Sequence, residues 1–279
     1  MKKVIFVADF FSNKLNGGAE NNDNVLINFL EKKGLSVLRV NSNNLENQSF
    51  KKDNFFIISN FIGLSESHKK LLKNESYIIY EHDHKYLKSR DPSRYPDFQI
   101  PKDQLINVDF YKNAKAVVVL SEVCREIIIR NLKLDNVHNI GCSLWSDERL
   151  NFIRSLSDRK KNNKLAILNS TNRIKNTALS IDFCRSKGLE YDLIQPCNPE
   201  DLLNNLSRYD GLVFLPGVLE TFSRISAEAK MLNCKLITKS RLLGFASEKI
   251  FDLQGLELIE EIRKRKNNAL KLFYGLITK

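Results

Sequence analysis

Two glutamates, Glu220 and Glu228, are eight residues apart in a segment whose pattern predicts their surroundings. Residues 211–215 are apolar enough for a buried strand, the Pro216-Gly217 pair is typical of a turn, and a helix is expected to open near Glu220. Eight steps along a helix advance it by roughly 12 Å and leave both side chains on a similar side. The pair therefore suits an extended ligand with an anionic group at the amide-rich helix N-terminus. Two glutamates on a solvated helix face would leave the same pattern.

A glycine pair lies close to the N-terminus. Gly17 and Gly18 stand between a predicted strand at 3–8 and a helical pattern at 24–33. Because glycine has no side chain, backbone N–H groups at this point can come close to phosphate oxygens. A flexible loop that binds nothing is the alternative.

Two basic residues, Arg173 and Lys175, follow the first strand expected in the second half of the chain, at 165–168. Fixed cations at this place, together with a helix N-terminus, could neutralise a diphosphate and stabilise a leaving group. No Asp-x-Asp motif occurs in the sequence, so we expect no metal bound through that motif. The alternative is that both basic side chains are simply solvated.

His82 and His84 follow a predicted strand at 77–80. Alternate residues of an extended segment share a face, so a His-x-His pair suggests a metal. The chain has only 4 histidines and no obvious third ligand, so we expect no metal site here.

The segment 85–102 is basic and aromatic and contains prolines, which favours a mobile loop. Its basic side chains could grip the phosphates of a substrate while its aromatic rings stack on bases. An ordinary surface loop with a few anchoring aromatic residues is an equal alternative. The basic residues in question are Lys85, Lys88, Arg90 and Arg94.

Short apolar runs alternate with helical segments along the chain, as in parallel α/β folds. The first series predicts a Rossmann-like domain over residues 1–145, and the second predicts another over 160–255 after a polar connection. A basic helical segment at 256–279 ends the chain. The predicted strands are 3–8, 35–40, 54–58, 77–80, 116–120, 165–168, 191–194, 211–215 and 235–238, and the clearest helical patterns are 24–33 and 122–132.

The Glu-x7-Glu spacing, the Gly-Gly-x-Glu loop at 17–20 and the Lys-Asn pair at 175–176 resemble the retaining glycosyltransferases of family 4, in a compact version. The resemblance covers most of the chain and implies the GT-B architecture, an α/β fold with two Rossmann-like domains facing a cleft. It also implies transfer of a sugar from a nucleotide-diphosphate donor to an acceptor hydroxyl, with retention at the anomeric carbon and without a cofactor. In such folds the last helix, here 256–279, can pack back onto the first domain.

Carried over by position, the resemblance assigns Glu220 to the donor sugar, Glu228 to the ribose, and Lys175 with Arg173 to the pyrophosphate. It places a histidine near the reacting centre, either His82 or His84. The expected donor-binding residues are Gly17, Gly18, Glu228, Pro216, Gly217, Thr221 and Phe222. The expected acceptor-side residues are His84, Lys85, Lys88, Arg90 and Arg94.

The sequence departs from the family pattern at several positions. Asn169-Ser170 replaces the usual Gly-Arg, Ser223 stands where glycine commonly follows, and Asn233 and Lys235 replace a flanking Gly and Pro. These departures put the fine geometry of donor binding in doubt and leave the fold unaffected.

The formal net charge of +11 favours an acidic partner, which could be a nucleotide sugar, an anionic membrane surface or nucleic acid. A cell-envelope glycan or a lipid-linked precursor is the default acceptor, and a hydroxymethylated base in phage DNA is the alternative. A sugar-nucleotide or nucleic-acid binding protein without catalysis is a further alternative. No apolar run reaches the roughly 18 residues of a membrane span, and the 5 scattered cysteines indicate reduced thiols. We therefore expect a cytoplasmic protein, at the inner membrane surface or in a host cytoplasm as variants of that expectation.

Overall fold

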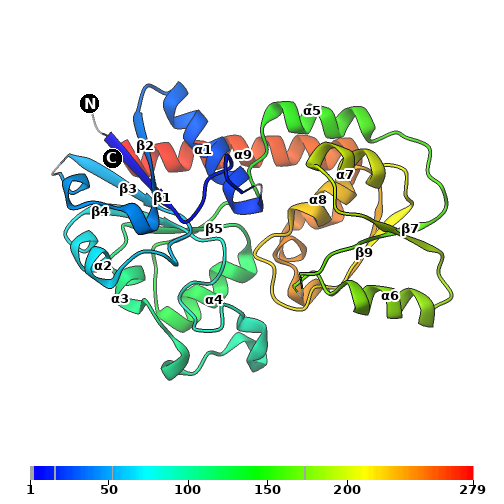
Figure 1. Ribbon diagram of the computed structural model, residues 1–279, viewed down its shortest axis with the longest axis horizontal. Coiled ribbons are helices and arrows are strands. Elements are labelled where there is room, and N and C mark those ends of the chain that lie inside the picture. The colour runs from blue at the N-terminus through cyan, green and yellow to red at the C-terminus, as the bar shows by residue number, and fades with distance from the viewer. Residues whose placement is uncertain (1–2, 16, 52, 173, 279) are drawn as a thin grey trace. The chain divides into compact units, whose positions relative to one another are not determined.

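The computed structural model describes residues 3–15, 17–51, 53–172 and 174–278 (Figure 1). The chain forms two compact units, one made of Met1–Trp145 with Arg265–Lys279 and the other of Ser146–Lys264. The C-terminal helix α9 (Gly255–Thr278) therefore contributes its first part to the second unit and its last part to the first.

The first unit is built on a sheet of six parallel strands in the order β2-β1-β3-β4-β5-β6. β1, β3 and β5 are buried almost throughout, as expected for a parallel sheet covered on both faces. The strands are β1 (Lys3–Ala8), β2 (Ser36–Asn41), β3 (Asn54–Ile58), β4 (Ser76–Tyr80), β5 (Ala116–Val119) and β6 (Val137–Asn139). The short strand β6 has no counterpart among the sequence predictions.

Helices cover both faces of this sheet. α1 (Gly18–Lys32) and the end of α9 lie on one face, and α2 (Glu66–Leu72), α3 (Val108–Lys112) and α4 (Glu122–Leu132) lie on the other (Figure 1). On the α9 side, the rings of Tyr80 and Phe273 meet at 4.8 Å. The long connection between β4 and α3 holds only 3₁₀ turns, at Pro92–Arg94, Pro96–Phe98 and Lys102–Gln104, and the remaining turns of this type are Ser42–Asn44 and Asn47–Ser49.

The second unit has a smaller parallel sheet in the order β10-β9-β7-β8. Its core gathers around Ile167, Cys184, Val213 and Leu215. The strands are β7 (Leu165–Leu168), β8 (Tyr191–Ile194), β9 (Gly211–Phe214) and β10 (Lys235–Thr238). The helices are α5 (Asp147–Leu156), α6 (Thr177–Ser186), α7 (Pro199–Leu206) and α8 (Arg224–Met231), followed by 3₁₀ turns at Ser240–Leu242, Gly244–Ser247 and Lys249–Asp252.

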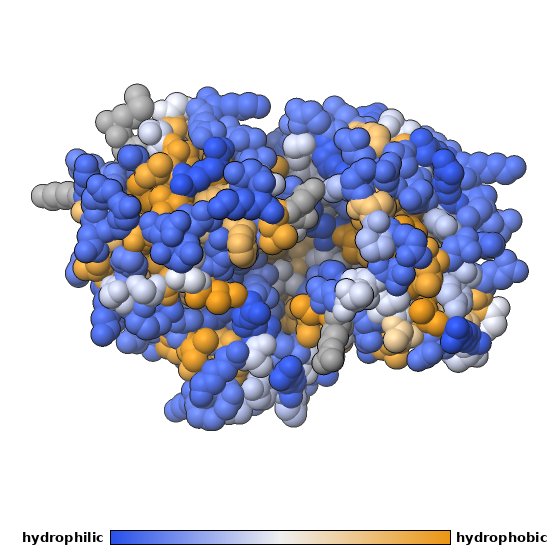
Figure 2. Space-filling view, viewed as in Figure 1, coloured by the Kyte–Doolittle hydropathy of each residue, from blue (hydrophilic) through white to orange (hydrophobic). Residues whose placement is uncertain are grey.

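Helix boundaries follow local sequence signals. The Ser146 side chain accepts the N–H of Arg149 at the start of α5, and Asn198 accepts two N–H groups at the start of α7, where Pro199 is the first helical residue. Both units thus show the strand-and-helix alternation that the sequence predicts. Figure 2 shows that hydrophilic residues cover most of the visible surface, with small hydrophobic patches among them.

Candidate active site

Glu220 lies in an extended segment four residues before a helix, so the prediction that both glutamates lie on one helix is wrong. Its N–H donates to the Leu242 carbonyl at 3.0 Å, and its carbonyl accepts from the Gly244 N–H at 2.8 Å. These bonds form an isolated parallel bridge between Glu220 and Leu243. α8 begins only at Arg224, so Glu228 is helical while Glu220 precedes the helix, and the helical spacing argument does not apply to the pair.

Two residues that flank α8 have a left-handed backbone, and both are departures from the family pattern. Ser223 has φ of 75° and Asn233 has φ of 58°, and both stand where the resemblance expects glycine. Glycine adopts these angles at no steric cost, and asparagine tolerates them better than most residues. The Ser223 hydroxyl lies 2.9 Å from that of Ser226, a contact that glycine could not make.

Glu220 and Lys175 form an ion pair at the carboxyl ends of β9 and β7, which are neighbouring strands. The Lys175 ammonium is 2.8 Å from a Glu220 carboxylate oxygen, with side-chain exposures of 31% and 16%. The Gly217 N–H donates to the Ile174 carbonyl at 3.0 Å, which ties the Pro216-Gly217 turn to the loop that carries Lys175. In parallel α/β sheets, ligands bind at this edge. Arg173, which was predicted beside Lys175, lies outside the described residues.

Glu228 is buried in α8, with 5% of its surface exposed, and it faces a partner that the sequence did not indicate. Its carboxylate is 3.4 Å from the guanidinium of Arg149 on α5. Arg149 also donates to the carbonyl of Pro199 at 3.1 Å, so its position is fixed from two sides. Glu228 is therefore a buried carboxylate paired with a cation from another helix of the same unit.

The other expected donor-binding residues differ in how exposed they are. Gly217 is exposed and Thr221 is half-buried, so both could contact a ligand. The side chains of Pro216 and Phe222 are buried, and the Phe222 ring packs on Phe245 at 5.2 Å. A donor contact of Phe222 would therefore come from its backbone.

In the first unit, His82 pairs with an aspartate that sequence reasoning missed. The His82 Nε2 atom lies 3.3 Å from Asp23 Oδ1, and both side chains are buried. The Ser59 hydroxyl donates to the same oxygen at 2.9 Å. Asp23 Oδ2 has no hydrogen-bond partner among the described residues. The only sequence signal was a polar residue on the inner side of α1, where Leu26 and Ile27 are core residues.

Gly17 precedes the first residue of α1, so the glycine pair lies at a helix N-terminus as predicted. A Cβ atom on Gly17 would overlap the carboxylate of Glu20. Burial raises the pKa of Glu20, and the nearby Asp23 and Asp9 raise it further, against a backbone hydrogen bond and His82, which lower it.

His84 and the basic loop do not form one exposed surface. His84 is buried, with Nδ1 3.0 Å from the Tyr86 hydroxyl. The side chain of Lys85, an expected acceptor-side residue, is only 2% exposed, and its acceptor-side role stays a prediction. Arg90 and Arg94 are exposed, and they pair with Asp83 at 2.6 Å and with the buried Asp91 at 3.5 Å. Lys88 is exposed.

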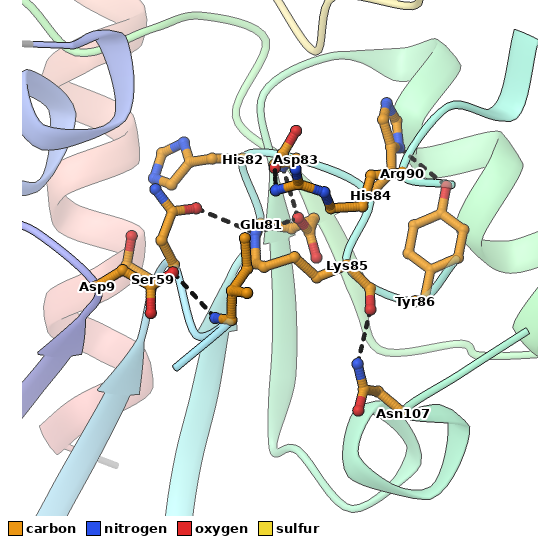
Figure 3. Close-up of polar contacts among 12 residues, drawn as sticks. Asp9, Ser59, Glu81, His82, Asp83, His84, Lys85, Tyr86, Arg90 and Asn107 are labelled. Atoms are coloured by element: carbon orange, nitrogen blue, oxygen red, sulfur yellow. Dashed lines mark hydrogen bonds and ion pairs between the residues drawn. The ribbon is translucent and has the colours of Figure 1, made fainter. Parts of the chain in front are cut away.

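Lys85 belongs to a buried polar cluster at the end of β4 (Figure 3). Its ammonium donates to Glu81 at 2.6 Å and to Asn60 at 3.2 Å, while its carbonyl accepts from Asn107 at 2.7 Å. Burial by itself would raise the pKa of Glu81. The Lys85 ammonium outweighs it, together with hydrogen bonds from Lys85, the Tyr111 hydroxyl and the Asp83 N–H, and the pKa falls to about 2.

Among the described residues, no group of three or more His, Cys, Asp or Glu side chains converges as a metal site requires. The predicted absence of a metal stays a prediction. Within the same residues, no helix has the length and hydropathy of a membrane span.

No protein-family model and no curated protein matches the chain, but solved structures match it over almost its full length. An alpha-glucosyltransferase in complex with UDP and a 13-mer DNA containing a HMU base has a TM-score of 0.50 and 12% identity, over 99% of each chain. AviGT4, a glycosyltransferase involved in avilamycin A biosynthesis, has a TM-score of 0.51 and 11% identity, over 99% of this chain and 97% of its own. Anabaena Alr3699/HepE, in complex with UDP and glucose, has a TM-score of 0.50 and 13% identity, over 96% of this chain and 90% of its own.

These similarities show the fold. The chain has the two Rossmann-like units of the GT-B glycosyltransferases, which confirms the predicted fold class.

Proposed function

We propose that the protein is a glycosyltransferase of the family 4 type, which moves a sugar from a nucleoside diphosphate donor to an acceptor hydroxyl. The Lys175–Glu220 pair is the main support. It lies at the ligand-binding edge of a Rossmann-like sheet, with a cation and a carboxylate 2.8 Å apart. A diphosphate would take over the Lys175 ammonium, and the released Glu220 carboxylate would accept hydrogen bonds from the sugar hydroxyls.

In the proposed reaction, the acceptor hydroxyl attacks the anomeric carbon from the face that the diphosphate leaves, so configuration is retained. The bond between the sugar and the phosphate oxygen breaks, and that oxygen takes up the proton of the acceptor hydroxyl. Lys175 and Arg173, with the N–H groups at the start of α8, stabilise the charge that develops on the leaving phosphate. On the first unit, the N-terminus of α1 at Gly17 and Gly18 would meet the phosphates. His82, held by Asp23, would lie near the reacting centre.

Incubation of the purified protein with UDP-sugars tests this function without an acceptor. Slow hydrolysis of the donor, seen as release of UDP and free sugar, is the expected result. A protein that binds UDP but releases no sugar from any donor would instead be a sugar-nucleotide binding protein.

We expect Glu228→Ala to weaken UDP binding by about 10- to 100-fold, because hydrogen bonds to a charged group contribute about 1.5–3 kcal/mol. In the proposed complex, Glu228 accepts hydrogen bonds from the ribose while Arg149 holds the carboxylate in place. Calorimetric titration with UDP measures the effect. Glu190→Ala, at an exposed position in the same unit, is the matched control. Equal UDP affinities of the Glu228 and Glu190 variants would remove Glu228 from the donor site.

Donor turnover should survive chelators. The sequence has no Asp-x-Asp motif, and in the proposed complex the Lys175 ammonium neutralises the diphosphate. UDP release is measured before and after dialysis against EDTA. Loss of activity that Mg²⁺ or Mn²⁺ restores would contradict the proposal of a metal-independent reaction.

Two acceptor classes fit this function. A cell-envelope glycan or lipid-linked precursor is the first. DNA with a modified base is the second, and it is favoured by the net charge of +11 and by the similarity to the alpha-glucosyltransferase bound to DNA.

A further inference from the structure

A cavity of about 870 Å³ in the first unit lies between α2, the segment after β4 and α3. Its lining is strongly basic, with two carboxylates, Glu66 and Asp109, against six cations. The six basic residues are Lys69, Lys70, Lys73, Lys85, Lys88 and Arg90. Only the last three belong to the loop that the sequence singled out, and the others come from α2 and its end.

The cations differ in how far they are neutralised. Lys69 pairs with Glu66 at 2.6 Å, and Lys85 pairs with buried Glu81 at the same distance. Lys73 lies 3.7 Å from Asp109, which is a long contact. Lys70 and Lys88 are exposed, and neither has a carboxylate within ion-pair distance among the described residues. The cavity thus keeps positive charge for an anionic ligand.

The cavity also exposes an aliphatic side chain. Ile62, which lines it, is 61% exposed. Ile62 is held in place, because its N–H donates to Asp9 Oδ2 at 2.9 Å and the next N–H, of Gly63, donates to Asp9 Oδ1 at 2.9 Å. An exposed isoleucine fixed beside lysines resembles the surfaces by which proteins contact lipid.

The aromatic residues of the cavity are placed differently. Phe61 is 1% exposed and Phe110 is 3% exposed, and their rings pack on each other at 5.2 Å. Binding of single-stranded nucleic acid relies on open ring faces on which bases stack. These two rings offer no such face, so the cavity suits an anion attached to an aliphatic chain better than it suits a nucleotide.

We propose that this cavity binds the phosphate or diphosphate group of a lipid-linked acceptor, with Lys70, Lys73 and Lys88 on the phosphate and Ile62 against the lipid chain. The proposal rests on the proposed glycosyltransferase function and names its acceptor class. Anionic headgroups attract each nearby basic residue, so the three lysines should act together on affinity.

The experiment measures co-sedimentation of the full-length protein with phosphatidylcholine vesicles that contain polyprenyl phosphate. The triple variant Lys70→Gln, Lys73→Gln, Lys88→Gln should bind about 100-fold more weakly at low salt. A matched triple variant, Lys32→Gln, Lys133→Gln, Lys187→Gln, removes three exposed lysines outside the cavity and should bind like wild type. Ile62→Ser should also weaken binding, whereas Leu256→Ser, with an equally apolar residue 41% exposed, should not.

Several outcomes would overturn the proposal: no binding to these vesicles, equal losses in both triple variants, or the same affinity for vesicles without polyprenyl phosphate. Inorganic pyrophosphate that competes as well as the lipid would show a site for soluble phosphate, and a DNA oligonucleotide that depends on the same lysines would make nucleic acid the ligand. Either result replaces the lipid-linked acceptor. Donor hydrolysis by wild type without vesicle binding would overturn this inference alone, and vesicle binding without hydrolysis would overturn the proposed function alone.

Discussion

Replacement of Lys175 by alanine is expected to lower the rate of sugar transfer at saturating donor by about 10²- to 10³-fold, or about 2–4 kcal/mol of transition-state stabilisation. The charge on the leaving diphosphate grows as the sugar–phosphate bond breaks. The Lys175 ammonium, which the diphosphate takes over from Glu220 when the donor binds, stabilises this charge. The effect should therefore fall on kcat as well as on kcat/KM, because the interaction is strongest in the transition state.

Glu220→Gln should abolish transfer in a protein that stays folded, since an amide cannot replace the carboxylate toward the sugar or the ammonium. The two residues touch, so the loss in the double variant should be smaller than the combined losses of the single variants. Lys164→Ala is the matched control, because Lys164 forms an exposed ion pair with Asp192 in the same unit. Steady-state rates with a saturating donor test whether Lys175 and Glu220 take part in catalysis. Wild-type kcat in either Lys175→Ala or Glu220→Gln would exclude that residue from catalysis.

Lys85→Met should lower the free energy of unfolding by about 3–5 kcal/mol, the usual cost of leaving a buried charge unpaired. The Glu81 carboxylate is 1% exposed and would lose the ammonium that lies 2.6 Å away. Urea unfolding with an unchanged m-value measures the loss. Arg90→Met removes an exposed pair with Asp83 close by in the chain, and it should cost at most about 1 kcal/mol.

The same ion pair makes stability depend on pH. The pKa of Glu81 is about 2 in the folded protein, below its ordinary value of 4.5. The unfolded chain takes up a proton at a higher pH than the folded protein does, so this contribution is complete above pH 4.5 and is lost as the pH falls toward 2. Lys85→Met should flatten that dependence. An equally steep loss of stability in the variant over this pH range would contradict the assignment to the Glu81–Lys85 pair.

The elements themselves were determined by the sequence. Buried parallel strands need continuous apolar runs, and surface helices need an apolar stripe. The apolar runs at 3–8, 54–58 and 211–215 therefore predict strands from local sequence alone. The sequence did not predict β6, because a strand of three residues is too short to show a periodic pattern. The Lys175 and Glu220 positions could also be named, since each lies in the loop that follows a strand of one parallel sheet, and the carboxyl ends of such strands share an edge.

The tertiary structure alone decided which groups meet. Arg149 and Glu228 are 79 residues apart and Asp23 and His82 are 59 apart, and no local pattern encodes such contacts. The tertiary structure also decides that Glu220 is not helical. Its segment pairs with Leu243, and α8 begins only after Ser223, which has a positive φ. The residues next to Lys85 in the sequence do not indicate that its side chain is buried. Its burial depends on Glu81, Asn60 and Asn107, which come together only when β3, β4 and the turn into α3 are assembled, because a buried ammonium is stable only where partners are already in place.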